Sequence, residues 1–353
     1  MIADLPARYV PDGRRATGGF GSVFFCDDTH LERKVAIKIV NDGSERRRIS
    51  DEVKALLQLR SKHVVQVYDV VVSRTGQIGI VQEYIEGEDL SEAEFPRQSA
   101  INYMATLWQV ASGISDIHSA GIIHRDIKPN NIKSNSEGII KIFDFGLARE
   151  DGPAARTVGF VGTRGFAAPE QLTGGLFTKA VDIYAFGGTA LFIANQALSA
   201  ELLALPPTQP RVNPFLSLPF EIDPAISSLL YQCLAVNPLD RPDMSTIKDT
   251  IARHLLFNRH QALAVYPTGA SYLNADEPVA SLEFPGVGKL DIQYDGLTFK
   301  VTNIEGEVFI NNDAYVIGEE IPGSCVVALG SPFRKATDRV FITFDVSYPE
   351  VVL

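Results

Sequence analysis

The chain has 353 residues, which at roughly 150 residues per domain suggests two domains. Apolar residues make up 45% and charged residues 21% of the sequence, so enough apolar surface exists for a buried core, and a mainly disordered chain is excluded. The net charge of −11 argues against a protein that binds nucleic acid or an anionic membrane through its overall charge. We therefore expect no nucleic-acid partner and no membrane partner.

The cysteine and hydropathy patterns favour a cytoplasmic protein. Cys26, Cys233 and Cys325 are too widely spaced for a disulfide framework or a Cys-x-x-Cys metal site. The most apolar long stretch, residues 181–206, contains polar and charged residues that make it a poor membrane span. The N-terminus lacks the apolar segment of a signal peptide.

The first 85 residues read as a small β-rich lobe. Residues 23–26, 35–40, 64–72 and 78–84 are rich in β-branched and aromatic side chains, which favour strands. One helix interrupts them, because the apolar residues between Ile49 and Leu57 recur at helical spacing.

Residues 86–260 read as a larger helical lobe. An apolar stripe runs from Ile101 to Ile117, and Gly121 suits the end of that helix. A loop-rich segment follows over residues 124–170, and further helices are predicted over 182–198, 224–235 and 244–256. The fold class of this part is α+β.

The last part of the chain differs in charge and in pattern. Residues 261–353 contain 13 acidic and 5 basic side chains, a net charge of −8, so we place a domain boundary near residue 260. Residues 261–284 look like a linker, because proline and glycine interrupt them. Residues 285–353 alternate apolar and polar residues, and Asp295-Gly296 is a strong hairpin signal. A small all-β, sandwich-like domain is expected there.

Two segments of the β-rich lobe suit phosphate binding. The run Thr17-Gly18-Gly19-Phe20-Gly21 precedes a strand, and glycines let backbone N–H groups approach a phosphate closely. Such a run alone is more often an ordinary turn. Lys38 lies on the next strand, and Glu52 lies on the apolar face of the following helix, where a carboxylate needs a cation. We therefore expect Lys38 and Glu52 to pair.

Three motifs follow in the helical lobe. They are His124-Arg125-Asp126-Ile127-Lys128-Pro129-Asn130-Asn131, Asp144-Phe145-Gly146 and Ala168-Pro169-Glu170. Singly, they have ordinary interpretations as a capping aspartate, a turn glycine and a proline before a helix. In this order, together with the glycine-rich run and Lys38, they are the protein-kinase signature set. The chain thus resembles the Hanks-type (eukaryotic-like) serine/threonine protein kinases over residues 10 to about 256.

The resemblance implies the two-lobed protein kinase fold, with ATP and Mg²⁺ or Mn²⁺ as cofactors and serine or threonine hydroxyls of proteins as substrates. The backbone of Glu83 to Ile85 would contact adenine, and Gln82 would guard the pocket behind it. The residues implied for ATP are Ala16, Gly18, Gly19, Phe20, Gly21, Val23, Ala36, Lys38, Gln82, Glu83 and Ile85.

The same resemblance implies the catalytic roles. Asp126 would orient the substrate hydroxyl and accept its proton, and Lys128 would lie beside the transferring phosphoryl group. Lys38 would contact the α- and β-phosphates while Glu52 holds it. Charge neutralisation and positioning are what phosphoryl transfer requires from a protein. The implied ligands of two magnesium ions are Asn131 and Asp144.

Three positions depart from the family pattern. Ala16 replaces the first glycine of the loop, Phe166 stands where tyrosine is usual, and Gln82 is polar where an apolar residue is commoner. None of these changes removes a catalytic group. The residues implied for the scaffold and the substrate platform are Thr163, Glu170, Asp182 and Arg241.

Between Gly146 and Ala168 the only hydroxyl groups belong to Thr157 and Thr163. Because Thr163 matches the family's threonine beside the catalytic aspartate, Thr157 is the candidate autophosphorylation site. A phosphate there would need arginines, and Arg125 and the run at residues 46–48 are candidates.

Two other functions stay open. A pseudokinase scaffold would not need the catalytic residues, all of which are present. A small-molecule phosphotransferase on a related fold usually lacks Lys128 and the segment from Thr163 to Glu170, which form a peptide-substrate platform. We therefore favour an active protein kinase.

From about Pro285 the chain resembles a forkhead-associated domain, a β-sandwich that binds phosphothreonine. The likeness lies in Val308-Phe309-Ile310-Asn311-Asn312 and in the later glycines around residues 318–330. No Gly-Arg pair and no Ser-Arg-x-His segment is present, and no histidine follows His260. An unrelated small β-domain is the alternative. The resemblance implies a degenerate module that regulates the kinase or docks a protein partner.

Overall fold

We analysed a computed structural model of the whole chain. It describes residues 5–18, 21–40, 56–57, 59–72, 77–145, 149–150, 162–173, 177–347 and 351. These residues form two compact units, the first extending to Ile251 and the second beginning at Ala252. Among the described residues, no helix is both long enough and apolar enough to span a membrane.

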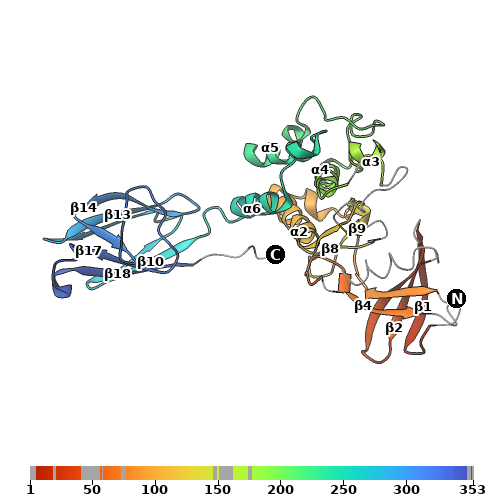
Figure 1. Cartoon of the computed structure of the whole chain (residues 1–353), viewed down its shortest axis with the longest axis horizontal. Coiled ribbons are helices and arrows are strands. Elements are labelled where there is room, and N and C mark those ends of the chain that lie inside the picture. Colours follow the sequence, from red (N-terminus) through yellow and green to blue (C-terminus); the bar gives the residue numbers. More distant parts are fainter. Residues whose placement is uncertain are drawn as a thin grey trace. The chain divides into compact units, whose positions relative to one another are not determined.

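The first unit begins with a five-stranded antiparallel sheet (Figure 1). Its strands occur in the order β1-β2-β3-β5-β4. The β-branched and aromatic residues of these strands alternate between its two faces, and one face buries a core around Phe24, Ile37 and Val81. The strands are β1 (Tyr9–Gly18), β2 (Gly21–Asp28), β3 (Arg33–Val40), β4 (Val67–Val72) and β5 (Ile78–Glu83).

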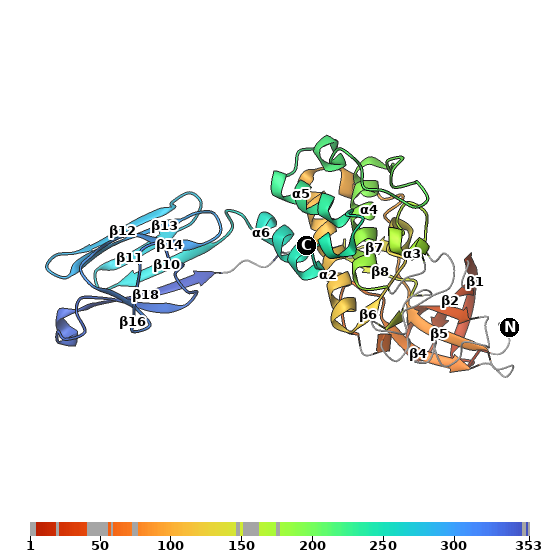
Figure 2. The same ribbon diagram turned by 45° about the horizontal axis from the view of Figure 1, so that its top comes forward.

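Helices are the longest regular elements in the rest of the first unit (Figure 2). The longest, α2 (Ala100–Ser119), begins where the Ser99 side chain accepts a hydrogen bond from the backbone N–H of Asn102. It ends before Gly121, whose φ of +73° favours glycine. The others are α3 (Pro169–Thr173), α4 (Ala180–Asn195), α5 (Pro224–Cys233) and α6 (Met244–Leu255).

Short strands and turns connect these helices and carry the loop-rich segment. The strand β6 (Ile122–Ile123) pairs with β9 (Arg149–Glu150), and β7 (Ile132–Ser134) pairs with β8 (Ile140–Ile142). The 3₁₀ turns are η3 (Phe95–Arg97), η4 (Pro129–Asn131), η5 (Pro214–Ser217) and η6 (Pro238–Asp240). The helices α2 and α4 and the strand β8 contribute buried apolar residues to the interior of the first unit. Examples are Leu107, Phe186 and Ile142.

The second unit is β-rich. Six strands form one antiparallel sheet in the order β11-β10-β18-β17-β15-β16, and three form another in the order β12-β13-β14. Buried residues from both sheets, such as Phe344 and Ile292, belong to one hydrophobic core. The elements are β10 (Gln261–Tyr266), β11 (Gly269–Leu273), β12 (Val279–Phe284), β13 (Gly288–Tyr294), β14 (Phe299–Glu305), β15 (Val308–Ile310), β16 (Asp313–Ala314), β17 (Cys325–Leu329), η7 (Ala336–Asp338) and β18 (Val340–Ser347).

The expected linker over residues 261–284 is wrong, because β10, β11 and β12 occupy it. Ala262 and Ala264 point into the core, and such small side chains gave a weak strand signal in the sequence. Pro267 and Pro278, interpreted as breaks, lie between these strands, and Gly269 is the first residue of β11. Strand β10 also pairs with β18, so the β-rich region begins at Gln261 rather than at residue 285.

The hairpin predicted at Asp295-Gly296 is confirmed by the pairing of β13 with β14. The Asp295 carboxylate accepts hydrogen bonds from the backbone N–H groups of Leu297 and Thr298 at 3.0 and 2.8 Å, which closes the turn. Gly296 has a φ of +95°, a conformation that glycine adopts readily.

Candidate active site

The N-terminal sheet gathers the expected ATP residues on one of its faces. The strand register pairs Val23 with both Ala16 and Lys38, and it pairs Ala36 with Gln82. Ala36 and Lys38 are two residues apart on β3, so their side chains point to the same side. Because paired residues share a face, all five lie opposite the buried core of this sheet. The backbones of Gly18 and Gly21 pair at the turn between β1 and β2.

The end of β5 fixes the predicted hinge. The Glu83 carboxylate accepts hydrogen bonds from the Lys141 ammonium at 2.9 Å and from the backbone N–H of Gln66 at 3.1 Å. Its own backbone N–H donates to the Gln66 carbonyl oxygen. The Glu83 side chain is therefore engaged by the protein, and the expected contact of the backbone up to Ile85 with adenine stays a prediction.

Lys38 reaches from β3 to Asp144, with which its ammonium forms an ion pair. Asp144 has a φ of +64°, and non-glycine residues in this conformation concentrate at functional sites. The structure thus brings together two of the predicted charged residues from distant parts of the sequence. Glu52, Gly19 and Phe20 lie outside the described residues, so the expected pairing of Lys38 with Glu52 stays a prediction.

Asp126 lies at the centre of a hydrogen-bonded ring. Its Oδ1 accepts from the Thr163 hydroxyl at 2.8 Å, and its Oδ2 accepts from the Lys128 ammonium at 2.8 Å. Lys128 also donates to Thr163 Oγ1 at 2.8 Å, which completes the ring. The ring fixes the position of a carboxylate that is 6% exposed.

Asn131 lies beside this ring and suits a metal ion. Its amide Nδ2 donates to Asp126 Oδ2 at 2.9 Å and to the Asp126 carbonyl oxygen at 2.8 Å, which fixes the orientation of its side chain. Among the described residues no group donates a hydrogen bond to its Oδ1. The Asn131 carbonyl oxygen also accepts from the N–H of Phe143, next to Asp144. An amide oxygen and a carboxylate are the donors that Mg²⁺ prefers, so these residues fit the ion.

The loop of residues 124–131, which carries Asp126, is supported by Asp182 of α4, and Asp182 is fully buried. Its Oδ1 accepts from the N–H of Arg125 at 2.7 Å, and its Oδ2 accepts from the N–H of His124 at 2.8 Å. His118, at the end of α2, donates from Nε2 to the same Oδ2 at 2.9 Å. Arg125 has a φ of +67°, a conformation that these bonds hold in place.

Substitution of Asp182 by asparagine should change how stability depends on pH. Burial alone would raise the pKa of the Asp182 carboxyl, but the hydrogen bonds from His118 and from the backbone outweigh it, so the pKa lies below its ordinary 3.8. A depressed pKa in the folded state contributes stability above the pKa of the unfolded state, and this contribution disappears as pH falls through the folded value. Urea unfolding below pH 4 should therefore show a weaker pH dependence in Asp182→Asn than in the wild type.

An Asp240→Asn variant, which changes an exposed acidic residue, serves as the control for that measurement. It should retain the wild-type pH dependence. Identical curves for the wild type and Asp182→Asn would show that the Asp182 carboxylate does not contribute this stability.

His124 is buried as a neutral imidazole. Burial lowers its pKa, and its two ring nitrogens have different partners. Nδ1 accepts from the N–H of Asp126 at 3.3 Å, and Nε2 donates to the carbonyl oxygen of Phe143 at 3.2 Å. The ring also packs on Phe145, with ring centroids 4.6 Å apart. His124 thus joins the loop of Asp126 to the segment of Asp144.

Glu170 and Arg241 form the predicted pair, a two-point contact at 2.6 and 2.9 Å. The guanidinium, whose side chain is fully buried, also donates to the carbonyl oxygens of Ala235, Ala180 and Val236 at 2.8 to 3.2 Å. These bonds tie the segment after Ala168 to the helices α4 and α5.

Three supporting residues were missed by the sequence analysis. Gln171 accepts from the N–H of Ala168 at 2.8 Å and donates to the carbonyl oxygen of Arg125 at 3.2 Å. His118 and Lys141 act through Asp182 and Glu83, as described above. A single histidine, glutamine or lysine in a helix or short strand resembles an ordinary polar surface residue, so the sequence holds no signal for these contacts.

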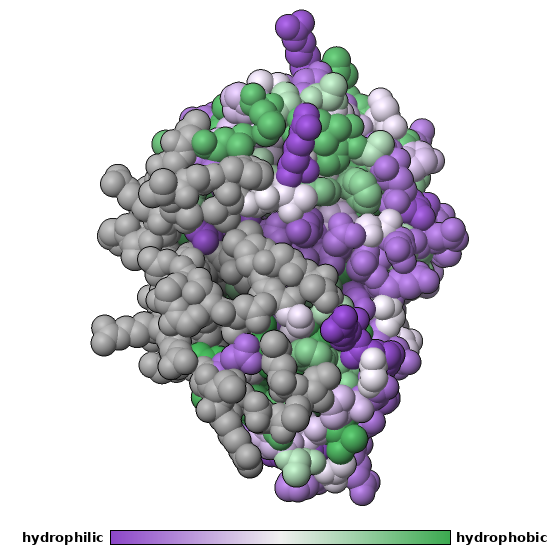
Figure 3. Space-filling view, turned by 90° about the vertical axis from the view of Figure 1, so that its right-hand side faces the viewer, coloured by the Kyte–Doolittle hydropathy of each residue, from purple (hydrophilic) through white to green (hydrophobic). Residues whose placement is uncertain are grey.

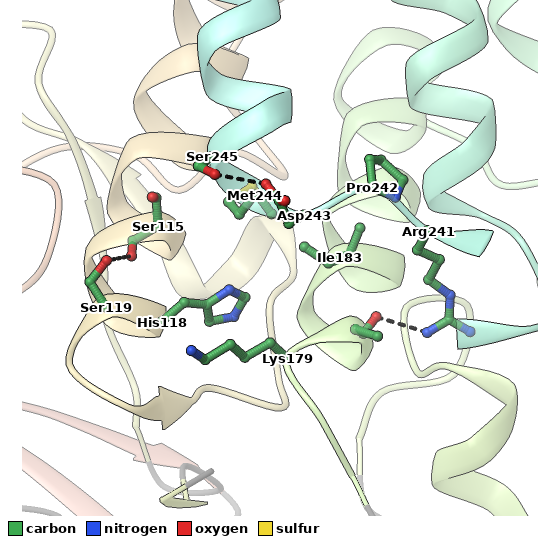
Figure 4. A pocket seen from close by; sticks show the side chains of 11 residues that line it. Ser115, His118, Ser119, Lys179, Ile183, Arg241, Pro242, Asp243, Met244 and Ser245 are labelled. Atoms are coloured by element: carbon green, nitrogen blue, oxygen red, sulfur yellow. Dashed lines mark hydrogen bonds between the residues drawn. The ribbon is translucent and has the colours of Figure 1, made fainter. Parts of the chain in front are cut away.

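His118 also lines a pocket between α2, α4 and the start of α6 (Figure 4). Figure 4 shows its ring beside the Lys179 side chain, with Asp243 and Ser245 on the other side of the pocket. The pocket therefore lies behind the loop of residues 124–131, on the helical side of the first unit.

On the face shown in Figure 3, hydrophilic side chains gather at mid-height, between the N-terminal sheet below and the helices above.

Comparison with known proteins agrees with this geometry. The family model described as "Protein kinase domain" matches residues 16–251. The chain is 32% identical over 264 residues to serine/threonine-protein kinase pkn3 of Myxococcus xanthus, which covers 67% of this chain and 47% of that protein. It is 38% identical over 186 residues to a serine/threonine-protein kinase, drp72, of Corynebacterium efficiens, covering 48% of this chain and 35% of the relative.

A third relative, serine/threonine-protein kinase PknL of Mycobacterium tuberculosis, is 31% identical over 258 residues, which are 67% of this chain and 63% of PknL. The chain thus spans between about one third and two thirds of the length of these relatives. The family match covers the glycine-rich turn, the ring around Asp126 and the Glu170–Arg241 pair. On this evidence the chain belongs to the protein kinase family.

Proposed function

We propose that the chain is an active serine/threonine protein kinase that transfers the γ-phosphoryl group of ATP to protein hydroxyls. The observation that carries the proposal is the ring of Asp126, Lys128 and Thr163, together with the ion pair that joins Lys38 of β3 to Asp144. A pseudokinase scaffold, which does not transfer phosphate, would not need these five side chains to be held together in this way.

Asp126 receives the substrate hydroxyl in this mechanism. Its Oδ1 accepts one hydrogen bond from the described residues, so a lone pair remains for the hydroxyl proton. As the substrate oxygen forms a bond to the γ-phosphorus, the bond from that phosphorus to the β,γ-bridging oxygen breaks, ADP leaves, and the proton passes to Asp126.

Lys128 and Lys38 supply positive charge to different parts of the ATP triphosphate. Lys128, held by Asp126 and Thr163, neutralises charge on the γ-phosphoryl oxygens, and Lys38 binds the α- and β-phosphates. Asn131 and Asp144 would hold a magnesium ion, which would supply positive charge against the phosphates. When nucleotide and metal bind, Lys38 exchanges part of its contact with Asp144 for phosphate oxygens.

The proposal is tested by incubating the chain with labelled ATP and three peptides that differ only in a central serine, threonine or tyrosine. We expect label in the serine and threonine peptides and none in the tyrosine peptide. Label in the tyrosine peptide alone, or in a small-molecule alcohol but in no peptide, would contradict the proposed substrate class.

Thr157, which lies outside the described residues, is proposed as an autophosphorylation site. A phosphate adds a charge of about −1.5 to −2 and orders a segment when arginines can bind it. Mass spectrometry should find phosphate on Thr157 after incubation with ATP, and Thr157→Ala should lower the rate of transfer to a peptide. A fully active enzyme with unmodified Thr157 would contradict this assignment.

For the second unit we propose a module like a forkhead-associated domain that has lost its phosphate receptor. Its two sheets with one core support the likeness, and so does the turn at Asn311 and Asn312, whose φ angles are +51° and +74°. The chain following His260 lacks the Gly-Arg and Ser-Arg-x-His segments of such receptors. The module would serve the kinase as a regulatory or docking element.

The second unit should not bind phosphothreonine peptides at micromolar concentrations. Two of its five bases are already paired, Lys289 with Asp291 and Lys300 with Asp295, and the sequence after His260 lacks the segments that bind the phosphate in forkhead-associated domains. Fluorescence polarisation of the full chain with a phosphothreonine peptide library tests this. Micromolar binding that disappears on dephosphorylation would reveal a phosphate site.

A further inference from the structure

The outer face of the six-stranded sheet carries an aromatic row. The register aligns Phe309 of β15, Ala328 of β17 and Phe341 of β18 across three neighbouring strands. In β18, Thr343 and Asp345 follow Phe341 on this face and are exposed, whereas Ile342 and Phe344 point into the core. Phe341 is 43% exposed, and Ala328 is buried between the two rings. Two aromatic side chains thus lie on the solvent side of the sheet.

The next row of the same face carries two valines with Thr343 between them. Val326 pairs with Thr343, and Thr343 pairs with Val265, so these three follow the aromatic row across β17, β18 and β10. Val326 and Val265 are each 45% exposed. A soluble protein rarely presents such a contiguous apolar surface without an interaction that covers it. We call these two rows the outer apolar face.

A cluster of bases borders the outer apolar face. Three of the five basic residues after residue 260, Arg334, Lys335 and Arg339, belong to the loop between β17 and β18. The other two form ion pairs with aspartates, as noted above. Among the described residues, no carboxylate lies within ion-pair distance of the three loop bases. In a region of net charge −8, this loop is therefore a local positive site.

Arg339 joins the bases to the aromatic row. Its guanidinium carbon lies 5.7 Å from the ring centroid of Phe309 and 5.3 Å from that of Phe341. Its Nε donates to the carbonyl oxygen of Gly330 at 3.1 Å, and among the described residues its two terminal nitrogens have no hydrogen-bond partner. A guanidinium held in this way offers two parallel N–H donors, which match a carboxylate.

Arg334 and Phe333 extend the same site. Arg334 donates to the carbonyl oxygen of Gly286 at 3.0 Å. Both arginines are thereby anchored to backbone carbonyl oxygens, Arg334 to Gly286 and Arg339 to Gly330. Phe333, which directly precedes Arg334 in this loop, is 97% exposed.

We propose that the outer apolar face and the loop of Arg334 to Arg339 together dock an acidic segment of a partner protein. Apolar side chains of that segment would cover Phe341 and Val326, and its carboxylates would bind Arg339 and Arg334. Charge complementarity selects this occupant, because an isologous contact with a second copy would bring two positive loops of like sign together. The site is separate from the kinase reaction and does not depend on it.

The test uses the full chain and a library of random twelve-residue peptides displayed on phage, selected without ATP. Selected peptides should be enriched in aspartate or glutamate beside phenylalanine, leucine or isoleucine. A synthetic peptide of the selected sequence should bind at least about tenfold more weakly to Arg339→Gln and to Phe341→Ser, because each loses a principal contact. Binding should also weaken as salt rises.

Matched variants serve as controls. Lys300→Gln removes a paired base of the same unit, and Val279→Ser removes a side chain that is 59% exposed on the other sheet, so both should bind like the wild type. Asp126→Ala should also bind normally, because the face takes no part in phosphoryl transfer. Urea unfolding curves establish that Arg339→Gln and Phe341→Ser remain folded.

Three outcomes would overturn the proposal. One is the failure of the library to yield any peptide that binds above background. Another is a set of selected peptides without enrichment in acidic residues. The third is equal binding by the wild type, Arg339→Gln and Phe341→Ser.

Discussion

Asp126→Ala is expected to lower the rate of phosphoryl transfer by about 10² to 10⁴, the usual contribution of a positioned acid–base group. The side chain supplies the acceptor for the substrate proton, and it also anchors Lys128, Thr163 and Asn131. No other described carboxylate takes part in that ring. Lys38→Ala and Asp144→Ala should likewise nearly abolish transfer, because each removes a charge that faces the phosphates or the metal.

The measurement is the initial rate of transfer from labelled ATP to a threonine peptide. The rate of each variant is compared with that of the wild type under conditions in which both proteins are equally stable to heat. Asp249→Asn, which changes an exposed carboxylate of α6, is the charge-matched control and should keep the wild-type rate. Wild-type activity in Asp126→Ala would refute the proposed role of this residue.

Arg241→Ala should destabilise the first unit by about 3 to 5 kcal/mol, the cost of breaking one side of a buried ion pair. The substitution leaves Glu170, whose side chain is only 16% exposed, without its cation, and three backbone carbonyl oxygens lose a donor. Arg241→Lys should recover only part of the loss, because one ammonium cannot replace the two-point contact and the contacts to three carbonyl groups.

Chemical unfolding measures this effect, and Lys248→Ala provides the comparison. Lys248 forms an ion pair with Asp249 on the surface of α6, and such pairs contribute no more than about 1 kcal/mol. If Arg241→Ala and Lys248→Ala shift the unfolding midpoint equally, the buried pair is not the structural element that we describe.

Much of the fold and site could be predicted because the signals were local or belonged to ordered motifs. The strand from Val35 to Lys38 alternates in a way that puts Ala36 and Lys38 on one face, and the register then brings Val23 and Gln82 to the same side. The pairing of Glu170 with Arg241, 71 residues apart, could be expected only from the family resemblance. Propensity and periodicity do not encode such long-range contacts.

Other features had no readable signal. His118 and Lys141 are common polar residues whose partners are fixed only by packing, and the contacts of Asp182 depend on how α2 and α4 meet. Strand β10 was missed because its inward residues include Ala262 and Ala264, which carry little apolar weight in a pattern. Its pairing with β18, some 80 residues away, supplies what the local sequence lacks.

The central claim, that this chain is an active serine/threonine kinase, is tested most directly by incubating it with ATP and Mg²⁺ and mapping phosphorylated residues by mass spectrometry. An Asp144→Ala variant, treated identically, provides the background. The account predicts phosphate on serine or threonine residues of the wild-type chain and of an added protein, and none in the variant. Absence of phosphate from both chains, or equal phosphate in both, would contradict it.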